Sequence, residues 1–178
     1  MAKQIVNQLD LIQTLLEDKF LEKGNDAKVL IEKNIMKRNI VVHNGITHLL
    51  YRYDPDKIKL FPYFSSKSGL HKICDYILFA SEGQHLHLLL IELKLGTESA
   101  TNQLSASECF AEFILNSAKR VGIELSNNIH IKKIRVSEER SKRRNRTTKP
   151  GKLELDQNGI INYDHSDVFR IKEVLDIH

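Results

Sequence analysis

The stretch CDYILFASEGQHLHLLLIELKLG, residues 74–96, decides the fold of this chain and the chemistry that it suggests. It holds two apolar runs separated by the turn-forming SEGQ, and so short a link favours an antiparallel pair of strands. The second run is apolar on both faces, which is typical of a central, covered strand. Charged residues nevertheless interrupt both runs: Asp75 begins the first, and Glu92 and Lys94 stand near the end of the second.

The alternation of side chains along a strand places Glu92 and Lys94 on one face, together with Leu88 and Leu90. A lone buried carboxylate costs on the order of several kcal/mol, so it needs a partner or an ion. Asp75, on the antiparallel neighbour, can supply a second carboxylate, and a divalent cation would relieve the repulsion between the two. Oxygen ligands of this kind favour Mg²⁺ or Mn²⁺ over zinc.

A purely structural interpretation of these charges is also available. Glu92 and Lys94 would then form a salt bridge near a strand end, and Asp75 would cap a turn elsewhere. An isolated E-x-K tripeptide is common by chance. The apolar flanks, the acidic residue on the preceding strand, the hairpin spacing and the helix that follows together favour the catalytic interpretation.

The residues before this hairpin predict two helices and further strands. Apolar residues at helical spacing predict a helix over residues 5–20, and Asp26 is a candidate cap for a second helix that reaches residue 35. From residue 39, β-branched runs around Asn44-Gly45 predict a hairpin. Residues 58–64 predict a short edge strand, because they contain a proline.

The residues after the hairpin complete an α/β pattern. A helix is predicted over residues 97–120 and a strand over residues 127–136, which implies a right-handed crossover onto the same sheet. A hairpin is predicted over residues 152–164, followed by a C-terminal segment that suits either a helix or a strand. The expected fold class is therefore α/β, with a mixed central β-sheet flanked by helices.

Asp75, the IELK motif with Glu92 and Lys94, and a following helix with Gln103 resemble the PD-(D/E)xK nuclease superfamily, the restriction-endonuclease-like fold. The resemblance covers about residues 73–136. It implies one nuclease-like domain over residues 1–178, with a basic loop at 140–150 and a C-terminal hairpin at 152–164. The activity implied is metal-dependent hydrolysis of phosphodiester bonds in nucleic acid, DNA favoured over RNA.

The resemblance also implies roles for particular residues. Asp75 and Glu92 would ligate Mg²⁺ or Mn²⁺, with the backbone carbonyl of Leu93 as a further ligand. Lys94 would orient or activate the attacking water and stabilise negative charge. Gln103 matches a glutamine on the following helix in several branches of the superfamily, although it is also an ordinary polar helix residue.

The chain departs from the superfamily pattern at one position and leaves another open. The residue before Asp75 is Cys74, where many members have proline. Many branches also carry a glutamate on an N-terminal helix, and Glu17 and Glu32 are both candidates for it.

The chain carries 27 Lys and Arg against 23 Asp and Glu, a net charge of +4. Its basic residues concentrate in RSKRRNRTTK, residues 140–149. Clustered cations bind nucleic acid through counterion release, whereas most charge runs are solvated surface loops. The candidate nucleic-acid contacts are Arg140, Lys142, Arg143, Arg144, Arg146 and Lys149.

The remaining polar residues offer weaker sites. His85 and His87 share the strand face opposite Glu92, near the turn, and we expect them at the solvent edge. His71 and Lys72 precede the Asp75 strand and are placed to approach a phosphate. Neither a G-x-S-x-G nor a phosphate-binding glycine loop is present.

Neither a membrane span nor a signal peptide is evident, and Cys74 and Cys109 suggest buried thiols in a reducing compartment, so we expect a cytoplasmic protein. Two interpretations stand beside the nuclease. One is a non-catalytic nucleic-acid-binding or assembly module on the same fold, and the other is a protein–protein module in a restriction or defence assembly. A homodimer would suit the cutting of two strands, by analogy alone.

Overall fold

The computed structural model describes residues 7–32, 36–53, 60–65, 67, 69–96, 98–137, 153, 155–163 and 168–177. The helices there are α1 (Gln8–Leu15), α2 (Thr101–Arg120) and α3 (Ile171–Leu175), with short 3-10 turns η1 (Asp18–Phe20) and η2 (Asp26–Lys28). The strands are β1 (Val29–Glu32), β2 (Met36–Val41), β3 (Ile46–Arg52), β4 (Tyr76–Glu82), β5 (His85–Lys94), β6 (Asn128–Ser137), β7 (Ile160–Tyr163) and β8 (Val168–Arg170).

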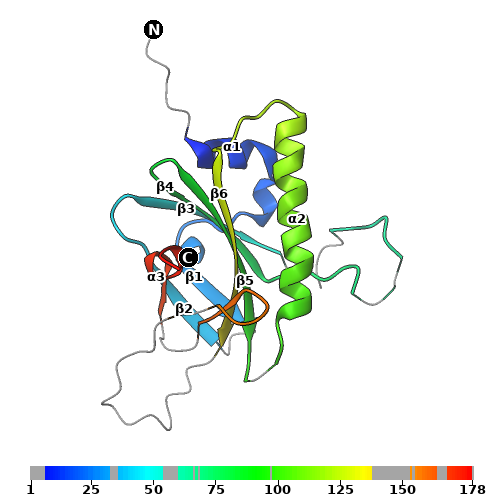
Figure 1. Cartoon of the computed structure of the whole chain (residues 1–178), viewed down its shortest axis with the longest axis vertical. Helices are drawn as coiled ribbons and strands as arrows, with labels where there is room; N and C mark the ends of the chain where they lie inside the picture. Colours follow the sequence, from blue (N-terminus) through cyan, green and yellow to red (C-terminus); the bar gives the residue numbers. More distant parts are fainter. Residues whose placement is uncertain are drawn as a thin grey trace.

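The larger sheet has the strand order β3-β4-β5-β6-β7 and is mixed (Figure 1). Strands β3, β4 and β5 are antiparallel neighbours, whereas β6 is parallel to β5 and β7 is parallel to β6. Helix α2 makes the connection between the parallel pair β5 and β6. The predicted antiparallel hairpin, the crossover helix and the α/β class with a mixed sheet are therefore confirmed.

Each face of this sheet has its own cover. One hydrophobic cluster joins one face of the sheet to α1 and α2, and the other joins the opposite face to α3 and to a second sheet of order β1-β2-β8 (Figure 1). The alternation along β5 divides accordingly, because Leu88 and Leu90 face the α2 side and Leu89 and Ile91 face the other. The face of Glu92 and Lys94 is thus the one that α2 covers.

The prediction of a helix from Asp26 to residue 35 is wrong. Residues 26–28 form only the turn η2, and β1 follows as an antiparallel partner of β2, with Val29 opposite Asn39. Val29 and Leu30 are both buried, so pairing and burial override the helical spacing of the apolar residues. The N-terminal helix is also shorter than predicted, since α1 ends at Leu15.

The Asn44-Gly45 pair does form a turn, but not a hairpin. Gly45 has φ +85°, which suits glycine, and strands precede and follow the turn as predicted. However, β2 pairs with β1 and β8, while β3 pairs with β4 in the other sheet. The turn is therefore a corner at which the chain passes from one sheet to the other.

The remaining predictions hold in part. Residues 60–64 form turns and not the expected strand. The Asn158-Gly159 turn is present with a single bridge between Leu155 and Ile161, while β7 pairs with β6. The C-terminal segment is both strand and helix, β8 followed by α3.

Two further expectations concern the basic run and the absence of a membrane span. The basic run, residues 140–149, lies outside the described residues. Among the helices of the described ranges, none is long and apolar enough to cross a membrane.

Candidate active site

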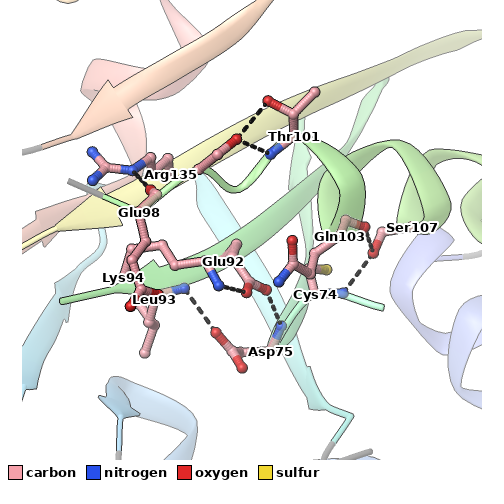
Figure 2. A network of polar contacts seen from close by, with 11 residues as sticks. Cys74, Asp75, Glu92, Leu93, Lys94, Glu98, Thr101, Gln103, Ser107 and Arg135 are labelled. Atoms are coloured by element: carbon pink, nitrogen blue, oxygen red, sulfur yellow. Dashed lines mark hydrogen bonds and ion pairs between the residues drawn. The ribbon is translucent and has the colours of Figure 1, made fainter. Parts of the chain in front are cut away.

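Asp75 and Glu92 lie opposite each other where the β4–β5 ladder ends (Figure 2). Tyr76 pairs with Ile91 at the end of the ladder. Asp75 directly precedes Tyr76 and Glu92 directly follows Ile91, so one carboxylate from each chain segment lies just beyond this pair. The N–H of Asp75 donates to Glu92 Oε2 at 3.2 Å, and the N–H of Leu93 donates to Asp75 Oδ2 at 2.7 Å. Each carboxylate thus accepts a backbone hydrogen bond from the other strand, which holds the two side chains next to each other.

Lys94 completes the polar group on this face. Its Nζ lies 2.8 Å from Glu92 Oε1, and the side chains of Lys94 and Glu92 are only 12% and 6% exposed. One lysine therefore faces two carboxylates in a mostly dry environment. An ion pair this buried costs desolvation energy that its own attraction repays only in part.

The pKa values of both carboxyl groups are raised. Burial is the main cause for each; the charge of Glu32 further raises the pKa of Asp75, and the charge of Asp75 further raises the pKa of Glu92. Lys94 lowers both pKa values but does not cancel these effects. The folded protein therefore disfavours the ionised form of both carboxyl groups, even with Lys94 beside them.

The electrostatics also bear on which glutamate joins the site. Glu32 ends β1 and acts on Asp75, whereas Glu17 is exposed at the N-cap of η1. Glu32 is therefore the better candidate for a third carboxylate, although it comes from a strand and not from a helix. Arg52, at the end of β3, also acts on Asp75 and lies 5.6 Å from the centre of the Tyr76 ring.

Ser107, which the sequence reasoning missed, ties α2 to the start of β4. Its Oγ accepts a hydrogen bond from the N–H of Cys74 at 2.6 Å and donates to the carbonyl of Gln103 at 2.8 Å. Ser107 is fully buried in the stripe formed by Leu104 and Ala111. A serine at an apolar position of a helix was the signal that could have indicated this contact.

Gln103 extends from α2 on the side of Cys74 and Glu92 (Figure 2). Within the described residues its side-chain amide makes no hydrogen bond to either carboxylate, so the structure places it near the site without linking it to them. Burial raises the pKa of the Cys74 thiol to about 12. The thiol at the position before Asp75 is therefore neutral and is no nucleophile.

Arg135 was also missed. It lies opposite Glu92 on β6, and it donates to the carbonyl of Glu98 at 2.9 Å and to that of Gly96 at 2.5 Å. These bonds anchor the connection between β5 and α2. The role depends on the parallel register of β5 and β6, which no local pattern reveals.

Comparisons with models of known protein families, with curated proteins and with solved structures found no match. Function must therefore be argued from the site.

The donor set suits Mg²⁺ or Mn²⁺. Among the described residues no three His, Cys, Asp and Glu side chains are grouped as a complete cation cage. Magnesium is usually bound by one or two carboxylates, with water and substrate phosphate as its other ligands. Asp75 and Glu92 meet that requirement, and within the described ranges no hydrogen bond reaches Asp75 Oδ1.

Two sequence predictions away from this site need correction. His85 is exposed at the turn as expected, but His87 is 6% exposed and stacks on His130 with ring centroids 4.9 Å apart. His87 lies opposite His130 of the neighbouring strand β6, on the face of the sheet that packs against α3 and the smaller sheet, and it is therefore buried. Cys109, expected to be buried, is exposed on α2, whereas Cys74 is buried.

Proposed function

We propose that this protein is a metal-dependent nuclease of the restriction-endonuclease-like fold. The observation that carries the proposal is the reciprocal pairing of Asp75 and Glu92, with Lys94 beside them, at the end of two buried strands. The mixed sheet and the helix that connects β5 to β6 support the same assignment. Neither strand end needs such buried charge for folding, because apolar residues would pack there at lower cost.

The residues divide the chemistry among them. Asp75, Glu92 and the carbonyl of Leu93 would hold Mg²⁺ or Mn²⁺, which supplies charge neutralisation and an activated water when bound. Lys94 places a cation where negative charge develops on the phosphate, inside a site with little water. Ser107 and Arg135 position the elements that carry these groups.

A non-catalytic nucleic-acid-binding module on the same fold is the second candidate. One observation favours it: the Lys94–Glu92 ion pair and the two reciprocal hydrogen bonds already satisfy much of the site without an ion. The two candidates differ in metal affinity and in turnover.

The test is cleavage of labelled DNA and RNA, single- and double-stranded, with Mg²⁺, Mn²⁺ or chelator. We expect metal-dependent cutting that falls at least about 100-fold in Lys94→Ala and in Asp75→Asn, as for removal of one charge-stabilising group. Lys133→Ala is the matched control, because Lys133 also forms an ion pair from an adjacent strand, with Glu108 at 3.0 Å. Cutting that survives both substitutions, or that persists in chelator, would disprove the proposal.

A further inference from the structure

A group of exposed aromatic side chains lies in the segment that leads to Asp75. Tyr63 is 73% exposed and Phe64 42%, and their ring centroids are 4.7 Å apart. Phe61 lies behind both, at 6.3 Å from Tyr63 and 6.0 Å from Phe64. We call Phe61, Tyr63 and Phe64 the aromatic platform. Large apolar surface left open to water in this way usually marks a binding site.

Ring contacts connect the platform to the site. Phe61 packs edge-on against Phe110 of α2 at 5.5 Å, and Phe110 packs against Tyr53 at the same distance. The N–H of Tyr53 donates to the carbonyl of Asp75 at 2.9 Å. The platform therefore rests on the residues that hold the first carboxylate in place.

The platform is also close to the site. The ring of Phe64 lies 6.3 Å from that of His71, and His71 precedes Asp75 by four residues. Four residues span at most about 14 Å, so, with the reach of the side chains added, the platform and the carboxylates lie within roughly 25 to 30 Å. A few nucleotides of an extended strand bridge such a distance.

The charge of this segment suits a polyanion. Residues 57–74 contain four lysines and no Asp or Glu. Of these, Lys67 is exposed and Lys72 partly exposed, and both lie within eight residues of Phe64 in the sequence. Nearby, Lys19 Nζ lies 5.1 Å from the ring of Phe20, which itself packs on Tyr53. Cations next to exposed rings are the combination that binds unpaired bases and their phosphates.

We propose that the aromatic platform and its lysines bind single-stranded nucleic acid by stacking on unpaired bases. Every base has a flat face, so this contact selects strandedness and not sequence. A duplex hides its base faces and gains only the phosphate contacts. That the bound strand is then delivered to Asp75 and Glu92 rests on the proposed nuclease function.

The test is binding in the presence of chelator, so that no cleavage can occur. Fluorescence anisotropy with a labelled oligothymidine and with a duplex of equal length measures the two affinities at a fixed salt concentration. We expect the single strand to bind more tightly. Tyr63→Ala should weaken its binding about 5- to 150-fold, the loss of one stacked base, and leave duplex binding unchanged. Tyr63→Phe, which keeps the ring, is the matched control and should bind as the wild type does.

The outcomes separate this inference from the proposed function. Equal affinity for both nucleic acids, or no effect of Tyr63→Ala, overturns the inference while leaving cleavage to be judged by Lys94→Ala. Self-association of the protein that is lost in Tyr63→Ala, without nucleic-acid binding, would show a protein interface instead and would also overturn it. Binding that depends on Tyr63 in a protein that never cuts would sustain the stacking site and reject the nuclease.

Discussion

The pair of carboxylates at the end of β4 and β5 shows how single residues can work against stability. Burial raises the pKa values of Asp75 and Glu92, and the charge of Asp75 further raises that of Glu92, so ionising the two groups costs the folded protein stability. The repulsion between the two charges is what a divalent cation relieves. Buried carboxylates that destabilise the fold are better explained by the binding of an ion than by a role in stability.

The metal-free protein should therefore lose stability as the pH rises. A carboxyl pKa that is higher in the folded state means that the folded protein binds more protons than the unfolded chain above pH about 4. Stability is then greatest near pH 4, as far as this pair is concerned, and falls as the pH rises through the raised pKa values. Thermal unfolding in chelator from pH 4 to pH 8 measures it, and Asp75→Asn should flatten the profile.

Manganese gives the complementary half of this prediction. At about 100 times its dissociation constant an ion that binds only the folded state adds about 2.7 kcal/mol, or roughly 5–10 °C for a domain of this size. The gain should be larger at pH 8 than at pH 5, because protons compete for the carboxylates at pH 5. An equal gain in Asp75→Asn would show that the ion binds elsewhere.

His87 should produce the opposite pH dependence. Burial, followed by the charges of His130 and Lys132, lowers its pKa to about 4, with His85 acting in the same direction and Glu82 against it. The unfolded chain then binds the proton more tightly, so stability is lost as the pH falls from about 6.5 towards 4. His87→Phe keeps a ring against His130 and should remove this loss, which the difference between the two melting profiles measures. Identical profiles would contradict it.

At the scale of elements, local patterns predicted the helices and strands that depend on neighbours in sequence and missed those that depend on strand pairing. The β4–β5 hairpin, α2 and β6 follow from apolar runs, a short turn and helical spacing, all of which act between neighbours in sequence. β1 was predicted as helix because its apolar residues fit both periods, and its pairing with β2 decides the outcome. The Asn44-Gly45 turn was predicted, but not that its two strands leave for different sheets.

The same limit applies to the candidate site. Asp75, Glu92 and Lys94 could be predicted because they share one hairpin. Ser107 and Arg135 could not be assigned, since their contacts join segments that lie 33 to 39 residues apart. Their roles depend on how α2 and β6 pack against that hairpin.

Ser107→Ala tests the link between α2 and β4. The substitution leaves the buried N–H of Cys74 without its acceptor, which costs about 1–3 kcal/mol. For a domain of this size the melting temperature should fall by roughly 2–12 °C. Ser105→Ala is the control, because Ser105 is exposed on the same helix and should leave the melting temperature unchanged. Equal effects of the two changes would mean that the link contributes nothing.

For the molecule as a whole, the two faces of the larger sheet have different roles. The α2 face carries the carboxylates, and the opposite face is closed by the smaller sheet and α3. The second sheet could not be predicted, because it depends on a contact between segments far apart in the sequence: β8 pairs with β2. The sheet that carries the site is thus covered on its opposite face by elements whose pairing lies away from the site.

Lys132 should stabilise the packing of α3 against the larger sheet. Its Nζ donates to the carbonyls of Val174, Leu175 and Ile177 at 3.0, 2.8 and 2.6 Å, which ties the end of α3 to β6. Lys132→Met keeps the packing but leaves these carbonyls without the cation, so unfolding free energy should fall by about 1.5–3 kcal/mol, the range for hydrogen bonds to a charged group.

Amide hydrogen exchange should localise the Lys132→Met effect, with faster exchange in β2, β8 and α3 than in β4 and β5. Lys133→Met is the matched control: Lys133 is the neighbouring residue of β6, its side chain is on the other face, and it forms an ion pair with the partly exposed Glu108 that is worth about 1 kcal/mol at most. Faster exchange spread evenly over both sheets would show instead that they unfold together, and that Lys132 stabilises the whole domain without a local role at the end of α3.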